Sequence, residues 1–187
     1  EDGSEETTPV FPKEDGFNVN YDGTIISVKL SSKEELELTV EQVKALIENN
    51  QLLEVIKDGV TLSIPPSVFG NGEPTRIIID ELESNPNSFS STYDLTIKQG
   101  NKFISEFDEG VTLTFNVDTT KAKNPNNLQV FYKNEETGKW ENIGGHYNEK
   151  NSTVTVVTKH FSTFTVLEAK TEGSDNIIEI VQKIQNQ

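Results

Sequence analysis

The feature that most constrains the fold of this chain is a succession of short segments in which apolar and polar residues alternate. Turn residues separate these segments at intervals of about 8–12 positions. In one of them Val111, Leu113, Phe115 and Val117 alternate with polar residues. Alternation with a period of two is typical of strands that bury one face. The sequence therefore predicts an all-β fold, mainly an antiparallel β-sandwich.

Turn signals indicate which strands pair. Asp58-Gly59 lies between two apolar segments and predicts a hairpin, and Gly100 lies between two more. Residues 124–167 are interpreted as a meander with turns at 136–138 and 148–151. In this interpretation residues 154–166, "VTVVTKHFSTFTV", form one long final strand.

One helix is expected inside the sandwich, over residues 39–50, where it would cover an end or edge of the sheets. Thr39 followed by Gln42 fits a capping box. Val40, Val43, Leu46 and Ile47 share one helical face.

Both ends of the sequence are polar. Residues 1–16 are predicted to be an acidic linker, and the ordered module is expected to span residues 17–168. Residues 169–187 are predicted to be a polar linker followed by a short amphipathic helix, whose apolar face comprises Ile177, Ile180, Val181 and Ile184.

Composition and charge argue against several classes of partner and ligand. The net charge of −15 repels phosphate backbones, so nucleic acid and anionic lipid are not expected partners. No apolar run approaches the ~20 residues that cross a bilayer, so membrane insertion is not expected. There is no cysteine. No cofactor is expected, and calcium is the one candidate ion, because its charge would neutralise the acidic surface. No D-x-D-x-D-G calcium loop is present, however.

His160 and Ser162 are the unusual residues of the final segment. In an unbroken strand both would lie on the same face as the apolar residues around them. One interpretation is a hydrogen-bonded structural pair with Phe161 packed on the opposite side. The other is self-cleavage of the Phe161–Ser162 peptide bond. Ser162 Oγ would attack the carbonyl carbon of Phe161 while His160 accepts the hydroxyl proton, and the peptide C–N bond would break to leave an ester. His160 could then activate the water that splits the ester.

Other polar clusters are interpreted as surface. Glu106, Asp108 and Glu109 form one such acidic cluster, typical of a solvated rim.

Trp140 is the only tryptophan in the chain. It is interpreted either as a hairpin aromatic packed on Phe131 or Tyr132, or as part of a sugar-stacking platform with Tyr132 and Tyr147.

Residues 17–168 resemble a known family. The shared features are the NP-x-N-L-x-V-x-Y strand, the T-G-K-W turn, the G-G-x-Y step and the T-x-HFST-x-x-V strand. The earlier segments "LTVEQVKALIENN…VTLSIPPSVF" and "STYDLTI" resemble the upstream half of the same module. These features are similar to a module of large surface-anchored proteins of Gram-positive bacteria, which often stands beside surface-layer homology, cohesin, dockerin or carbohydrate-active modules. The HFS triplet at residues 160–162 also resembles the cleavage site of ZU5-type domains and, more distantly, that of GAIN domains.

The resemblance implies an extracellular, cell-surface module of a surface or cellulosome-type protein. Such a module is mostly non-enzymatic and acts as a spacer, a support or a contact surface. Its partners would be neighbouring modules of the same polypeptide, together with cell-wall or plant polysaccharide. For the HFS triplet the resemblance implies His160 as the base and Ser162 as the nucleophile of a single self-cleavage. A carbohydrate-binding module using Trp140 is the third hypothesis.

Overall fold

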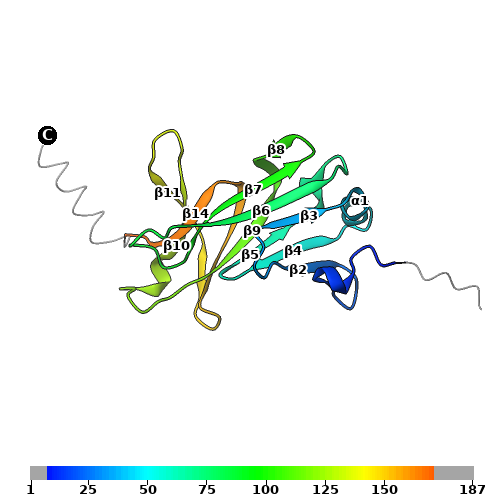
Figure 1. The fold of residues 1–187 in the computed structure, drawn as a ribbon. Helices are drawn as coiled ribbons and strands as arrows, with labels where there is room; N and C mark the ends of the chain where they lie inside the picture. Colours follow the sequence, from blue (N-terminus) through cyan, green and yellow to red (C-terminus); the bar gives the residue numbers. More distant parts are fainter. Residues whose placement is uncertain (1–7, 171–187) are drawn as a thin grey trace, which may run out of the picture.

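The computed structural model describes residues 8–170, which form two seven-stranded β-sheets and one α-helix, α1 (Val40–Glu48) (Figure 1). The all-β sandwich prediction is confirmed. In order across the first sheet, the strands are β1 (Phe17–Val19), β2 (Ile25–Lys29), β4 (Leu52–Lys57), β5 (Val60–Ile64), β9 (Glu106–Asn116), β13 (Thr153–His160) and β12 (His146–Asn148).

The second sheet carries one strand on the side of its main path. Its strands are β11 (Trp140–Gly144), β10 (Leu128–Lys133), β14 (Thr163–Glu168), β7 (Thr92–Gln99), β6 (Thr75–Leu82) and β3 (Glu35–Leu38), with β8 (Lys102–Ile104) paired to β7. Three 3-10 turns complete the described chain: η1 (Lys13–Asp15), η2 (Pro66–Phe69) and η3 (Pro125–Asn127). Strands β2 and β4 pair in parallel, and the other described pairs are antiparallel.

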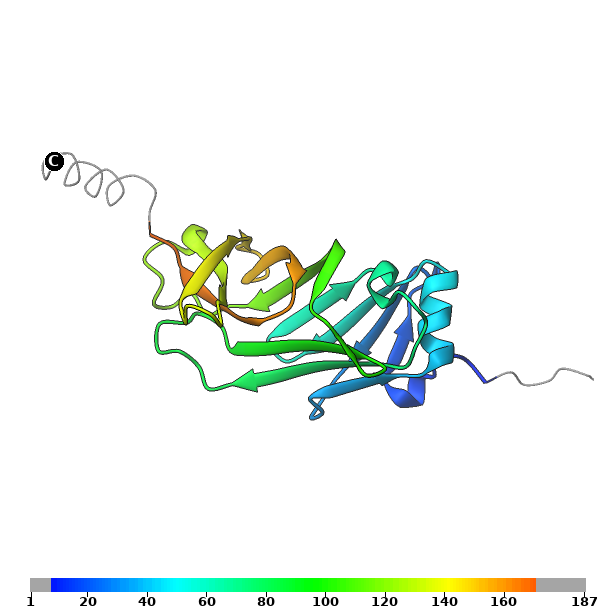
Figure 2. The ribbon, with the colours of Figure 1, turned by 90° about the horizontal axis from the view of Figure 1, so that it is seen from above.

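The body is elongated, with α1 at one end and β10, β11 and β14 at the other (Figures 1 and 2). The first described residues approach beside α1, and β14 leads residue 170 out at the opposite end.

Helix α1 forms as the sequence predicts. The Thr39 hydroxyl accepts a hydrogen bond from Gln42 N, and the Gln42 side chain accepts one from Thr39 N, which completes the capping box. Val43 and Leu46 are fully buried, whereas Val40 and Ile47 at the margins of the apolar face are partly exposed. The helix therefore closes one end of the core with the centre of its apolar stripe.

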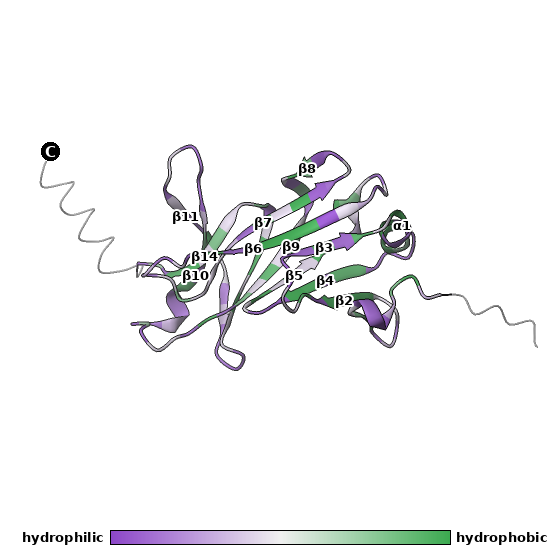
Figure 3. Ribbon diagram, in the orientation of Figure 1, coloured by the Kyte–Doolittle hydropathy of each residue, from purple (hydrophilic) through white to green (hydrophobic). Residues whose placement is uncertain are grey.

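The core follows the period-two alternation. In β5, Val60, Leu62 and Ile64 are buried and the residues between them are not. Hydrophobic residues concentrate on strands such as β4 and β6, and turns such as the β10–β11 connection are hydrophilic (Figure 3). Burial of these side chains contributes most of the stabilisation of such a sandwich, at about 25 cal/mol per Å² of apolar area.

Packing begins before the predicted boundary at residue 17. The Phe11 ring is buried and lies edge-on to Phe17, with 5.3 Å between the ring centroids. Gln42 Nε2 donates to Val10 O at 3.0 Å. The body thus includes residues that the sequence analysis assigned to the acidic linker. The predicted C-terminal helix, at residues 177–184, lies outside the described residues.

The prediction of one long strand over residues 154–166 is wrong. β13 ends at His160 in the first sheet, and β14 begins at Thr163 in the second. The predicted meander is also interrupted, because the chain crosses between the sheets at Gly144 and Gly145, from β11 to β12. The alternation pattern does not show these crossings because it continues on both sides of them.

Candidate functional site

The HFS triplet lies at a corner where two chain segments pass between the sheets side by side. Ser105 connects β8 of the second sheet to β9 of the first, and residues 161–162 return the chain from β13 to β14. Phe161 N donates to Ser105 O at 2.9 Å, and His160 pairs with Glu106. We call residues 105–107 and 160–163 the crossover corner.

Phe161 anchors the corner in the core. Its side chain is only 8% exposed and lies edge-on to the ring of Phe107, with a centroid separation of 4.9 Å and an interplanar angle of 84°. Leu95 N donates to Ser162 O at 3.0 Å. The backbone on both sides of the Phe161–Ser162 bond is therefore held by hydrogen bonds, and an aromatic pair fixes the side chain between them.

The imidazole of His160 is half-buried between two aromatic rings. The Tyr132 ring lies at a centroid distance of 4.6 Å and the Phe164 ring at 5.9 Å. Nδ1 lies 3.3 Å from Thr158 Oγ1, and the Thr158 hydroxyl donates to His160 O at 2.9 Å. Nε2 is buried and has no hydrogen-bond partner within residues 8–170.

Ser162 faces the same strand end as His160 but is engaged elsewhere. Its Oγ donates to Lys133 O at 3.2 Å, one residue beyond the tyrosine that His160 contacts. In the described part of the chain no hydrogen bond joins His160 to Ser162. The structure thus brings the predicted base and nucleophile to one place, the end of β10, without pairing them.

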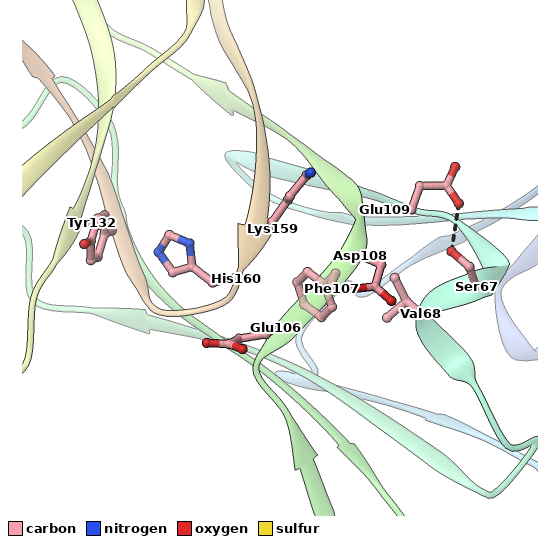
Figure 4. Close-up of a pocket in the computed structure, with 9 residues that line it drawn as sticks. All are labelled: Ser67, Val68, Glu106, Phe107, Asp108, Glu109, Tyr132, Lys159 and His160. Carbon is pink, nitrogen blue, oxygen red and sulfur yellow. Dashed lines mark hydrogen bonds between the residues drawn. The ribbon is translucent and has the colours of Figure 1, made fainter.

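A cleft opens beside the corner because β9 bulges away from β13. The pairing of Thr158 with Val111 shifts to that of His160 with Glu106, so that residues 107–110 lie opposite Lys159 alone. The cleft has a volume of about 1080 Å³ (Figure 4). It is lined by Ser67, Val68, Glu106, Phe107, Asp108, Glu109, Tyr132, Lys159 and His160.

Sequence reasoning missed this cleft, although its assignment of Glu106, Asp108 and Glu109 to the solvated surface agrees with their exposure. The signal that could have revealed it is Gly110 inside a strand, because an interior glycine often marks a bulge or a close approach. A Cβ at Gly110 would lie 2.3 Å from Val157 Cγ1. Glycine therefore permits β13 to approach β9 closely at the edge of the bulge.

The predicted aromatic platform is not assembled. Trp140 lies opposite Lys133 in the β10–β11 register and Tyr132 lies opposite Glu141, so the two aromatic residues occupy opposite faces of the sheet. The Tyr132 hydroxyl hydrogen-bonds to the Glu141 carboxylate, which raises the pKa of Tyr132. Tyr147 belongs to β12 of the other sheet and packs on the core.

Two further features bear on ligands and membranes. Residues 8–170 contain no group of three or more histidine, aspartate or glutamate side chains placed to hold a metal ion. No helix in that range is long and apolar enough to span a bilayer.

Comparison with known proteins finds no matching family model. The chain is 34% identical over 148 residues to a protein named "Putative membrane protein" from Evansella cellulosilytica, a match that covers 74% of this chain and 22% of that protein. It is 31% identical over 115 residues to an amylopullulanase from Thermoanaerobacterium thermosulfurigenes, covering 60% of this chain and 5% of the enzyme. The chain is thus a β-sandwich module that spans a small part of the longer bacterial proteins it resembles.

Proposed function

We propose that this chain is a non-catalytic spacer module of an extracellular, surface-associated bacterial protein, whose partners are the neighbouring modules of the same polypeptide. The observation that carries the proposal is the placement of the chain ends. The described chain enters at the α1 end of an elongated body and leaves at the other (Figures 1 and 2). A module built this way adds its full length to a string of modules.

The topology also suits a module that bears tension. β14 runs toward the exit end and lies between β10 and β7, with which it forms antiparallel pairs. A pull on residue 170 along the long axis loads these strand contacts in shear. Several hydrogen bonds must then break together, which resists extension more than breaking them one by one.

Single-molecule pulling tests the spacer role. The chain is held between identical folded handles at its two ends and extended at constant speed. We expect one cooperative unfolding event with a length gain of about 50 nm, because an extended chain adds about 3.4 Å per residue. Extension without a force peak would contradict the proposal. In parallel, no reducing sugar should be released from starch or pullulan, and turnover above buffer would contradict the non-catalytic assignment.

A second candidate function, self-cleavage between Phe161 and Ser162, is favoured by the way the corner is pinned. Hydrogen bonds from Phe161 N and to Ser162 O hold the backbone on both sides of the bond. If the bond were cut, β14 would stay in place between β10 and β7. In this hypothesis His160 is the base, although no hydrogen bond joins it to Ser162 in the described residues.

Intact-mass measurement over several days tests this second candidate. Cleavage predicts two associated fragments, replacing the 20.9 kDa species. Ser162→Ala should abolish the cut, because alanine has no nucleophilic oxygen. Ser152→Ala, in the exposed turn before β13, is the matched control and should cleave like the parent chain. A single uncut species in all three samples rejects self-cleavage and leaves the spacer proposal intact.

A further inference from the structure

We propose that the cleft beside the crossover corner binds a neutral, polyhydroxylated ligand, namely a short oligosaccharide. This binding site is distinct from the Trp140 face and goes beyond the spacer role. Its volume of about 1080 Å³ is comparable with the upper end of the range for small-molecule sites, about 300–1,000 Å³. It is therefore large enough for more than one sugar ring.

The polar groups of the cleft are not satisfied by one another. The side chains of Glu106, Asp108 and Lys159 have no hydrogen bond or ion pair within residues 8–170, although all three line the cleft. In Figure 4 the Lys159 ammonium points away from the Glu106 carboxylate, and the Glu106 and Asp108 carboxylates lie on opposite sides of the β9 ribbon. Charged groups without protein partners keep their hydrogen-bonding capacity for a ligand.

The charge pattern selects the class of ligand. Three carboxylates repel an anion, and the Lys159 ammonium offsets part of their attraction for a cation. An apolar ligand would remove four charged groups from water without offering them hydrogen bonds, which is costly. A hydroxyl group donates to a carboxylate and accepts from an ammonium, so a ligand with several hydroxyls can pair with both kinds of group.

The walls are also held in position by the fold. Glu109 is fixed by the Ser67 hydroxyl, which donates to its Oε2 at 2.7 Å. Tyr132 forms one end of the cleft and is itself fixed by its contacts with His160 and Glu141. A site that is formed before the ligand arrives loses less conformational entropy on binding.

Calorimetric titration of the whole chain with maltohexaose, cellohexaose, xylohexaose and chitohexaose tests the proposal. We expect saturable binding of at least one of them. Asp108→Ala and Lys159→Ala should each weaken it at least tenfold, and both replace side chains without partners in the described structure. Thermal unfolding at an unchanged midpoint confirms that these variants fold. Trp140→Ala, which removes the other candidate sugar contact, should bind within twofold of the parent chain.

Three results would overturn the proposal. The first is no saturable binding of any of the four hexasaccharides at millimolar concentration. The second is binding that survives both cleft substitutions but is lost in Trp140→Ala. The third is saturable binding of tetralysine, abolished by Asp108→Ala, in the absence of saccharide binding, which would show that the cleft takes cations. None of these results bears on the pulling experiment, so the spacer role is judged separately.

Discussion

The chain crosses between the two sheets in different ways at Gly144-Gly145 and at the crossover corner. At the first crossing both glycines have positive φ, of 91° and 127°. At the second, no residue of the HFS triplet has positive φ, and the turn contains no glycine. Phe161 is buried against Phe107 there, and neighbouring strands bind the backbone on both sides.

The difference shows two physical routes to the same topological result. The glycine crossing uses backbone conformations that residues with a Cβ rarely adopt. The corner at residues 160–163 uses ordinary backbone and holds its direction by side-chain burial and hydrogen bonds. We therefore expect backbone substitutions to damage the first crossing and side-chain truncations to damage the second.

Phe161→Ala should have the largest effect. It removes a buried ring together with its contact to Phe107, and we expect a loss of about 3–4 kcal/mol in the free energy of unfolding. Urea unfolding followed by tryptophan fluorescence measures it. Phe103→Ala is the control, since Phe103 is 68% exposed and contacts the Lys98 ammonium, so it should cost below about 1 kcal/mol. Equal losses in the two variants would mean that Phe161 does not anchor the corner.

Gly145→Ala tests the other crossing. A Cβ there would lie 3.1 Å from Val154 Cγ1 and 3.3 Å from Thr155 O, at a φ of 127°. We expect a loss of about 2–3 kcal/mol from combined strain and crowding. Gly144→Ala meets nothing within 4 Å and carries only the cost of its φ of 91°, so about 1 kcal/mol is expected. The same chemical denaturation compares them, and a reversed order would show that steric contact is not what selects glycine at 145.

The two crossings also differ in how far the sequence reveals them. Gly144-Gly145 is a recognisable breaker, although the meander interpretation passed over it. The HFS corner has no breaker, and the alternation of Val154, Val156 and Thr158 resumes beyond it as Phe164 and Val166. The capping box at Thr39 and the hairpin at Asp58-Gly59 were predictable because they depend on residues close in sequence. The cleft was not, because its walls come from segments up to about 90 residues apart, and only packing brings them together.

Thr158→Val tests whether the Thr158 hydroxyl fixes the backbone of the corner. The Thr158 hydroxyl donates to His160 O, accepts from His160 N and contacts Nδ1. Valine has the same shape but leaves these groups unpaired, so we expect a loss of about 1–2 kcal/mol. Thr155→Val is the control, three residues earlier in β13. It loses only a contact with the Thr114 hydroxyl and should cost less than about 0.5 kcal/mol. Equilibrium unfolding of both variants tests this, and a neutral Thr158→Val would show that the hydroxyl does not fix the corner.

The smallest expected effect lies just beyond the corner, where Asp94 pairs with Thr163 on one side and with Asp80 on the other. Burial raises the pKa of Asp94. The Thr163 hydroxyl, which donates to Asp94 Oδ1 at 3.2 Å, opposes the rise, and the charges of Asp80 and Glu135 add to it. Between its unfolded and folded pKa the native chain binds more protons at Asp94, so stability falls as pH rises through this window and stays lower above it.

Asp94→Asn removes the charge and keeps an oxygen that can accept from Thr163. We expect the variant to be more stable than the parent chain at pH 7 by a fraction of 1 kcal/mol, because the group is half-exposed and solvent screens it. The gain should vanish near pH 3, below the unfolded pKa.

Asp118→Asn is the control of opposite sign: hydrogen bonds from Thr120 lower the pKa of Asp118, so its ionised form is favoured in the native state. It should give no gain at pH 7. Melting temperatures of the three proteins between pH 3 and pH 7 measure these differences in stability. A stability gain of Asp94→Asn that persists at pH 3 would show that the gain does not come from the titration of Asp94.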